Sequence, residues 1–164
     1  MIKLRAPEPE DLDLMYRIEN DSSLWQYGGQ NQPVSRYLLR QYIEQSSADI
    51  YRDGQLRLTI EDGGVAAGFL DLTNLSTIHQ RAEVGIVVDS VAQRRGVGKQ
   101  SLANLIEYVR QNIPLRQIYA VVGVENTAGN CLFRSAGFVQ TCTLPGWITV
   151  NLQPQDAILW TYQL

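Results

Sequence analysis

The sequence predicts an α/β fold in one domain, residues 1–164, with a mixed sheet of about seven strands and about four helices on its faces. Three observations predict this class. The length suits one domain with a proper core rather than two. A hydrophobic fraction of 45% and a charged fraction of 19% are ordinary for a globular protein. Strand and helix patterns also follow one another without an internal repeat or a long linker, which favours a sheet covered by helices.

The first third of the chain predicts one strand and two helices. Residues 2–7 alternate like a short strand that stops at a proline. Residues 9–21 place apolar side chains at helical spacing and acidic ones in the first turn, where the helix dipole favours negative charge. The aromatic, glycine-containing segment 24–35 indicates a loop. Ser35 then suits the N-cap of a helix over residues 35–47.

The middle of the chain predicts three strands and a helix. The strand LRLTI, residues 56–60, is followed by Asp-Gly-Gly, which favours a hairpin turn. Residues 65–75 and 81–88 supply two more strands. A helix comes next, because apolar residues recur at i, i+3, i+4 and i+7 from Leu102.

The last third predicts a strand, a helix and a closing pair of strands. The continuous apolar run of residues 117–124 is typical of a buried strand. Residues 126–138 indicate a short helix that Gly137 ends in a left-handed cap. The segments 139–144 and 157–164 then close the sheet.

Composition argues against several classes of function. A net charge of −3 gives no excess of positive charge for binding nucleic acid. No apolar run approaches the ~18 residues of a membrane span, and the first residues lack the apolar core of a signal peptide. Two cysteines without a CxxC pair, and a single histidine, argue against a metal site. We therefore expect a cytoplasmic protein with reduced thiols, no metal, and no nucleic-acid or membrane partner.

Residues 92–102, AQRRGVGKQSL, join a strand to a helix and concentrate positive charge there. Backbone N–H groups at a helix start lack acceptors, and the helix dipole adds positive charge. Gly96 and Gly98 let an anion approach the main chain closely. Three basic side chains surround the same point: Arg94, Arg95 and Lys99. The stretch predicts a phosphate or pyrophosphate site, with a plain structural turn as the alternative.

Two common nucleotide motifs do not fit this stretch. The Walker pattern matches only Gly98-Lys99, since Gln93 and Gln100 stand where its opening glycine and closing hydroxyl belong. The Rossmann pattern fails because Ser101 replaces its third glycine. The predicted anion site therefore belongs to another kind of protein.

The residues Gln93 to Gly98 fit the pattern [Q/R]-x-x-G-x-[G/A]. With the strand AEVGIVV before them and ENTAGNCLFRSAGF after them, the chain resembles the GNAT superfamily of acyl-CoA-dependent N-acetyltransferases. The later segment is similar to the family's helix N-x-x-A/S-x-x-L-[FY]-x-x-x-G-F, with Gly129 in place of the usual alanine or serine. KLRAPEPEDLDLMYRIEND and IHQRAEVGIVV are most similar to the branch of spermidine and ribosomal-protein N-terminal acetyltransferases.

The resemblance implies a mostly antiparallel sheet, in which the strand carrying residues 84–88 splays away from the strand 117–124. Acetyl-CoA, the implied cosubstrate, would lay its pantetheine arm in that gap and pair with the strand backbone. Asn126 would bind the arm or a nearby water, or serve as a helix N-cap. The implied cofactor-binding residues are Ile86, Val87, Val88, Gln93, Arg94, Arg95, Gly96, Val97, Gly98, Lys99, Asn126 and Phe133.

The implied chemistry is direct attack of a neutral amine on the thioester, which needs a base. Glu83 is the expected catalytic base, because the apolar strand around it would desolvate its carboxylate. An ion pair with Arg81 is the alternative. In many relatives, a tyrosine that donates a proton to the leaving thiolate stands where this chain has Phe133. Water could replace that tyrosine, activity could be weak, or another tyrosine could substitute: Tyr162, Tyr119 or Tyr108.

The acceptor side is expected in the first third of the chain. Residues 1–62 hold 11 of the 17 acidic and 7 of the 14 basic residues, a net −4. An acidic and aromatic pocket for a cationic amine would use Glu19, Trp25, Tyr27 and Glu44. Solvated carboxylates and packed aromatic rings are the alternative.

Four functions follow from these observations. The first is an N-acetyltransferase that acts on a polyamine or another small cationic amine. The second acts on the N-terminus of a (ribosomal) protein, and the third binds CoA with little turnover. The fourth, a general anion-binding domain, would make the match from Asn126 to Phe138 a coincidence. Relatives in this branch form dimers or larger rings, so a homo-oligomer is also expected.

Overall fold

The computed structural model describes residues 1–164 and places seven strands in one sheet, in the order β1-β2-β3-β4-β5-β7-β6. Neighbouring strands are antiparallel, except that β4 and β5 run parallel. The predicted mixed and mostly antiparallel sheet is confirmed. The strands are β1 Ile2–Arg5, β2 Leu56–Asp62, β3 Val65–Ser76, β4 Arg81–Val88, β5 Gln117–Gly123, β6 Val139–Val150 and β7 Gln153–Gln163.

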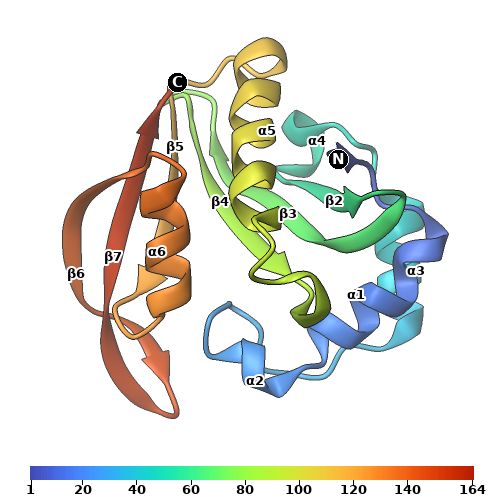
Figure 1. Ribbon diagram of the computed structural model, residues 1–164, viewed down its shortest axis with the longest axis horizontal. Coiled ribbons are helices and arrows are strands. Elements are labelled where there is room, and N and C mark those ends of the chain that lie inside the picture. Colours follow the sequence, from blue (N-terminus) through green and yellow to red (C-terminus); the bar gives the residue numbers. More distant parts are fainter.

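Six α-helices accompany the sheet (Figure 1). They are α1 Leu12–Glu19, α2 Ser22–Trp25, α3 Arg36–Gln45, α4 Ile50–Asp53, α5 Val97–Asn112 and α6 Thr127–Ser135, and two short 3-10 turns cover Pro9–Asp11 and Ser90–Ala92. The four predicted helices are α1, α3, α5 and α6. The sequence did not predict α2 and α4, because four residues are too few to show a helical period.

Local signals at the helix ends act as predicted. The Ser35 side chain accepts a hydrogen bond from the backbone of Leu38 and caps α3. Gly137 adopts a left-handed conformation, with φ of 91°, just after α6. No helix is long and apolar enough to cross a membrane.

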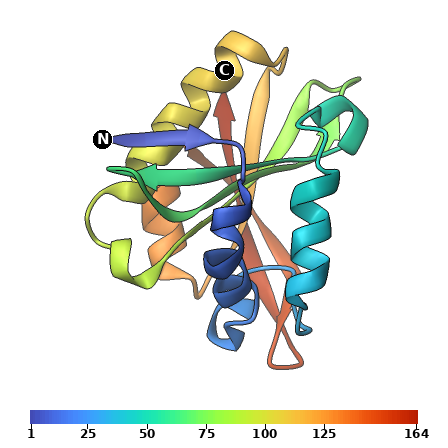
Figure 2. The ribbon, with the colours of Figure 1, turned by 90° about the vertical axis from the view of Figure 1, so that its right-hand side faces the viewer.

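The sheet divides the helices into two layers, as Figure 2 shows. Helices α5 and α6 cover one face and contribute to a core of 22 buried residues with the inward side chains of β2 to β5 and β7. Helices α1 and α3 cover the other face with a smaller core: Leu14, Met15, Ile18, Leu39 and Phe69. Because side chains alternate along a strand, each strand presents one set of residues to each layer.

The parallel pair β4 and β5 opens into a V (Figure 1). Only three positions are paired, and the last joins Glu83 to Tyr119. Beyond it, β4 pairs only with β3, whereas β5 pairs only with β7. The predicted splay is therefore confirmed, and the backbone of residues 84–88 has one edge without a neighbouring strand.

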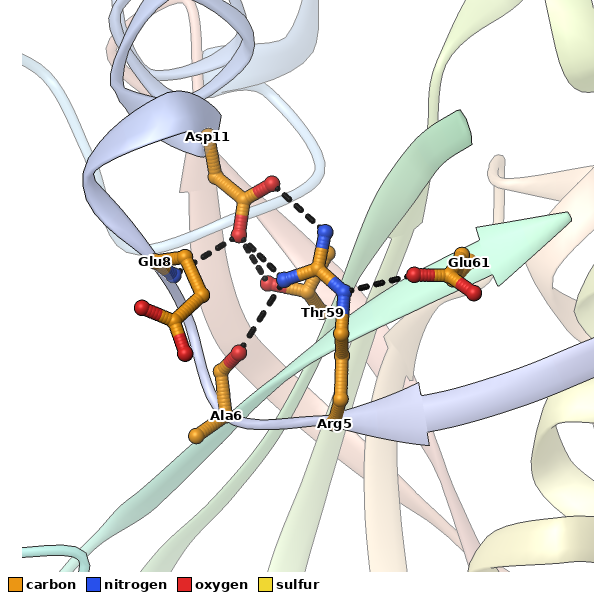
Figure 3. A network of polar contacts seen from close by, with 6 residues as sticks. All are labelled: Arg5, Ala6, Glu8, Asp11, Thr59 and Glu61. Carbon is orange, nitrogen blue, oxygen red and sulfur yellow. Dashed lines mark hydrogen bonds and ion pairs between the residues drawn. The ribbon is translucent and has the colours of Figure 1, made fainter. Parts of the chain in front are cut away.

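A buried ion pair fastens the end of β1 to the start of α1 (Figure 3). Arg5 donates two hydrogen bonds to Asp11, at 2.7 and 2.9 Å, and a third to Glu61 at 2.8 Å. Asp11, which is 2% exposed, also accepts from the Thr59 hydroxyl and from the backbone of Glu8. Although burial alone would raise the pKa of Asp11, these donors lower it below its ordinary value.

The last two strands are longer than predicted. β6 continues past residue 144 because the sheet absorbs Pro145 and Gly146 in a bulge between Leu144 and Ile148. Gly146 adopts a φ of 57° there, and its N–H donates to Asp156. Pro145 and Gly146, which suggest the end of a strand, therefore form a bulge within one continuous strand.

Candidate active site

The start of α5 has the geometry of an anion site. Gly96 has a φ of 79° and ends the turn that begins at Gln93. None of the backbone N–H groups from Arg94 to Lys99 donates to a protein acceptor. The Gln93 amide donates to the carbonyl oxygen of Val88 at 2.9 Å, which holds the turn against the end of β4. We call residues 93–99 the phosphate loop.

The two glycines of the phosphate loop have different roles. A Cβ at Gly96 would meet no atom within 4 Å, so this glycine serves the left-handed backbone. A Cβ at Gly98 would lie 3.3 Å from both δ-carbons of Leu132, so this glycine also lets α5 approach α6. The two glycines thus have structural roles in addition to the predicted approach of an anion, which stays a prediction.

The basic side chains of the phosphate loop are exposed to solvent. Arg95 reaches Asp62 at 3.1 Å, whereas Arg94 and Lys99 make no ion pair. These two side chains can therefore turn toward a bound phosphate without breaking a contact in the protein. The site combines free N–H groups and free cations, as an anion requires.

The open edge of β4 lies directly before the phosphate loop. Ile86 and Val88 pack toward the α5–α6 layer, and Val87 packs toward the α1–α3 layer. Their side chains therefore pack on both faces of the strand beside the opening. An extended ligand can pair with this edge as an added strand would.

Asn126 begins α6 beside the end of β5. Its side-chain oxygen accepts from the backbone of Gly129 at 2.9 Å, so the N-cap interpretation is correct. Its NH₂ group has no acceptor and is free for a ligand. Phe133 is 4% exposed and packs edge-to-face on Phe138, with ring centroids 5.0 Å apart. Contact of Phe133 with the cofactor stays a prediction.

Sequence reasoning missed a buried polar contact behind this helix. Asn130 accepts from the indole of Trp160 at 2.9 Å and donates to the carbonyl of Gly123 at 3.0 Å. The contact fixes α6 to the last residues of β5, where the V is widest. A buried asparagine in an amphipathic helix is the only sequence signal that could have indicated it.

Glu83 lies at the closed end of the V, on the sheet face that α1 and α3 cover. Its carboxylate accepts from the Asn74 amide at 2.6 Å and makes no ion pair with Arg81. The alternative prediction, an ion pair between Glu83 and Arg81, is therefore wrong, because the partner of Glu83 is Asn74. The residue is half-buried, and Asn74 binds only one of its two carboxylate oxygens.

Among the three candidate tyrosines, Tyr119 shares this place with Glu83. Burial and then the negative charge of Glu83 raise the pKa of Tyr119, so its hydroxyl stays protonated at neutral pH. Tyr162 lies in the other layer, against Phe138, and accepts from Arg110. Tyr108 also lies there, on α5.

A pocket of about 290 Å³ opens on the same face as Glu83. Arg57 binds both oxygens of Asp71 at 2.7 and 2.9 Å and donates to Glu19 at 2.7 Å. Burial alone would lower the pKa of Arg57, but these carboxylates raise it well above its ordinary value. We call it the acceptor pocket; its lining residues are Glu19, Val34, Leu38, Leu39, Tyr42, Gln55, Arg57, Asp71 and Thr73.

The acceptor pocket includes one of the four predicted substrate residues. Glu19 lines it, and the indole of Trp25 donates to the Glu19 carbonyl at 2.9 Å from outside. Tyr27 and Glu44 are exposed and do not line it. Sequence reasoning missed Arg57 and Asp71, because their pairing across β2 and β3 depends on strand register.

The acceptor pocket and the V meet at β3. Thr73 and Asp71 line the pocket and stand opposite Glu83 and Gly85 of β4. A ligand in the pocket therefore lies on the same sheet face as the Glu83 carboxylate, beside the opening that receives an extended ligand. No group of three or more His, Cys, Asp or Glu side chains is placed to hold a metal ion.

A free strand edge, a helix start with free backbone N–H groups and an adjacent acidic pocket are the features expected of an acyl-CoA-dependent transferase. The comparison with known families agrees. The acetyltransferase (GNAT) domain model matches residues 2–139, and the chain belongs to this family. It is an acetyltransferase that uses acetyl-CoA as its cosubstrate.

Individual relatives and solved structures are also similar to the chain. It is 25% identical to the spermidine N(1)-acetyltransferase of Escherichia coli (strain K12), over 96% of this chain and 83% of that relative. The fold matches spermidine N-acetyltransferase from Vibrio cholerae in complex with CoA and spermine, with a TM-score of 0.87, 24% identity, and coverage of 99% and 95%. It also matches the Salmonella typhimurium acetyltransferase that modifies the N-terminal serine of ribosomal protein L7/L12, with a TM-score of 0.86, 20% identity, and coverage of 99% and 95%.

Proposed function

We propose that this enzyme acetylates a small cationic amine of the polyamine type, held in the acceptor pocket. The observation that carries the proposal is the charge of that pocket. Glu19 and Asp71 face the single cation Arg57, so the pocket keeps a net charge of −1. Val34, Leu38, Leu39 and Tyr42 supply an apolar wall for the methylene chain between two amino groups.

The position of the pocket supports the same acceptor. Because Thr73 and Asp71 are cross-strand neighbours of Glu83 and Gly85, an amine anchored by its distal charge would direct its other nitrogen toward the V. The names of the relatives agree with this: one is a spermidine N(1)-acetyltransferase, and the Vibrio cholerae structure holds spermine.

In the proposed reaction, the phosphate loop binds the pyrophosphate of acetyl-CoA and the edge of β4 pairs with the pantetheine arm. The neutral amine nitrogen attacks the thioester carbon and forms the new C–N bond, and the C–S bond breaks. Glu83 accepts the proton that the nitrogen loses, directly or through water. The CoA thiolate takes a proton from Tyr119 or from water, since thiols of pKa near ~8.5 are adequate leaving groups.

An amine panel tests the acceptor. Thiol release from acetyl-CoA is measured with spermidine, spermine, a monoamine of equal chain length and a peptide with a free N-terminal serine. We expect turnover with the two polyamines and a much higher KM for the monoamine. Turnover with the peptide alone would replace our proposal by N-terminal acetylation. CoA binding without turnover of any amine would leave only the binding function.

The Glu83→Gln variant tests the base. Its kcat should fall about a hundredfold at neutral pH, because glutamine cannot take the proton. Glu107→Gln, an exposed position on α5, is the matched control. Full activity of Glu83→Gln would remove Glu83 from the reaction.

We also propose that the enzyme works in the cytoplasm. Both cysteines, Cys131 and Cys142, are free and exposed, which suits a reducing compartment. Cell fractionation with an antibody to the chain tests this location. Assembly into a homo-oligomer stays a prediction, and sedimentation of the purified protein tests it.

A further inference from the structure

We propose that Asn74 is a positioning residue, which holds the Glu83 carboxylate in the orientation that the reaction needs. The proposal rests on the role of Glu83 given above. Neither the sequence patterns nor the family motifs indicated Asn74. Three independent observations support it: a bulge, an unusual backbone conformation and a short hydrogen bond.

The bulge lies in β3, opposite the closed end of the V. Thr73 pairs with Glu83, but the next pair joins Ser76 to Arg81, so β3 has one residue more than β4 in this interval. In a regular strand, Asn74 would point away from the face that Thr73 and Glu83 share. The bulge redirects the Asn74 side chain toward β4.

The backbone of Asn74 supports the same interpretation. Its φ is 50°, in the left-handed region that disfavours most side chains. Glycine, asparagine and aspartate tolerate this region best, and asparagine alone among them has a side-chain donor. The position therefore combines a backbone requirement with a need for an N–H group.

The hydrogen bond joins Asn74 Nδ2 to Glu83 Oε2 at 2.6 Å. The Tyr119 hydroxyl also interacts with the Glu83 carboxylate from β5, so Asn74 is the partner that β3 supplies to this carboxylate. The bond engages one carboxylate oxygen and leaves the other oxygen available to accept a proton. Without it, the carboxylate would lose its partner on β3.

Other charged groups near Glu83 do not replace this contact. Arg81 lies on the same face of β4 without pairing to Glu83, and Tyr119 faces it from β5. Asp71 on β3 is bound to Arg57, which also neutralises Glu19 of α1. These groups are the same in every variant described below, so a difference between variants reports on residue 74.

The test uses two substitutions that the backbone tolerates. Asn74→Asp keeps the size and the left-handed tendency of the residue but replaces the donor with a second carboxylate. Asn74→Gly removes the side chain and relieves the backbone. Asn151→Asp is the matched control, since Asn151 has a φ of 51° in the turn between β6 and β7. Thermal unfolding establishes that each variant folds.

The readout is kcat as a function of pH, measured from acetylated product with one amine, so that ionisation of the amine is common to all variants. We expect Asn74→Asp to lower kcat about tenfold at neutral pH and to move the acid limb of the profile up by about one pH unit. Asn74→Gly should move the limb in the same direction by less, and Asn151→Asp should leave it unchanged.

The outcomes separate the two proposals. A wild-type acid limb in both Asn74 variants, with loss of activity in Glu83→Gln, would overturn the role of Asn74 and keep Glu83 as the base. Full activity of Glu83→Gln would overturn both. A change only in the melting temperature or in KM would reduce Asn74 to a structural bulge residue and would also overturn the proposal.

Discussion

Glu83 and Tyr119 form the last pair of residues between β4 and β5, and the two strands separate immediately beyond them. The carboxylate and the hydroxyl thus lie where the sheet opens, on the face that also carries the acceptor pocket. A thioester held in the opening would meet an amine from the pocket beside these two side chains. The proposed base and the proposed acid would then both stand beside the reacting atoms.

The Gly96→Asp substitution should abolish CoA binding. It adds a negative charge beside the pyrophosphate and strains a backbone with a φ of 79°. Gly54→Asp is the control, because Gly54 has a φ of 70° and equally open surroundings but lies far along the chain, after α4. Calorimetric titration with CoA measures both. Equal affinity in the folded Gly96→Asp variant would contradict the phosphate loop.

Removing the charge of Glu19 should weaken the binding of a polyamine. In Glu19→Gln the acceptor pocket becomes neutral, so we expect KM for spermidine to rise about tenfold with little change in kcat. The same change should hardly affect a monoamine. Glu44→Gln, exposed on α3, gives the comparison. An equal rise of KM in both variants would extend the acceptor site to Glu44.

The Tyr119→Phe substitution tests the source of the proton for the thiolate. If Tyr119 supplies it, kcat should fall about tenfold or more, and Tyr162→Phe should leave kcat unchanged. The raised pKa of Tyr119 keeps the hydroxyl protonated across the working pH range. The rates of both variants in the thiol-release assay decide the matter. Wild-type kcat in Tyr119→Phe would assign the proton to water.

Acid should unfold the protein in part through Asp11. Because its folded pKa is lowered, the stabilisation from this carboxylate is complete above its unfolded pKa of about 3.9 and is lost as pH falls toward the folded value. Asp11→Asn should lower the free energy of unfolding by about 3 kcal/mol at neutral pH and flatten its dependence on acid. Urea unfolding at several pH values measures this effect.

Asp13→Asn is the matched control for Asp11, since the Asp13 side chain is 85% exposed in its pair with Arg36. Exposed pairs contribute little to stability. Equal losses in the two variants would mean that burial of Asp11 adds nothing to the fold.

Strong periodicity and family motifs made most of the fold predictable. The four longer helices and all seven strands were anticipated, because each is long enough to show an apolar pattern or a recognisable end signal. The one-turn helices α2 and α4 were not. The extension of β6 was missed because Pro145-Gly146 signals a turn when only the local sequence is considered.

The residues of the site also fall into those that the sequence could indicate and those that it could not. The phosphate loop is one continuous segment, so its residues could be proposed from the sequence alone. Arg57, Asp71 and Asn74 act through partners on neighbouring strands, and only the strand register brings them together. Glu83 was predicted from its strand, but its partner is Asn74 rather than Arg81, because the β3 bulge is invisible in the pattern of apolar residues.

The three-position pairing of β4 with β5 has a consequence for the sheet as a whole. This junction joins β1 to β4 with β5 to β7 through fewer paired positions than any other pair of neighbouring strands has. A pantetheine arm bound there would pair with the free backbone groups of the strands, so the cosubstrate would link the two parts of the sheet. Amide hydrogen exchange in residues 84–88 should then slow when CoA is added, while exchange in β1 and β2 stays constant.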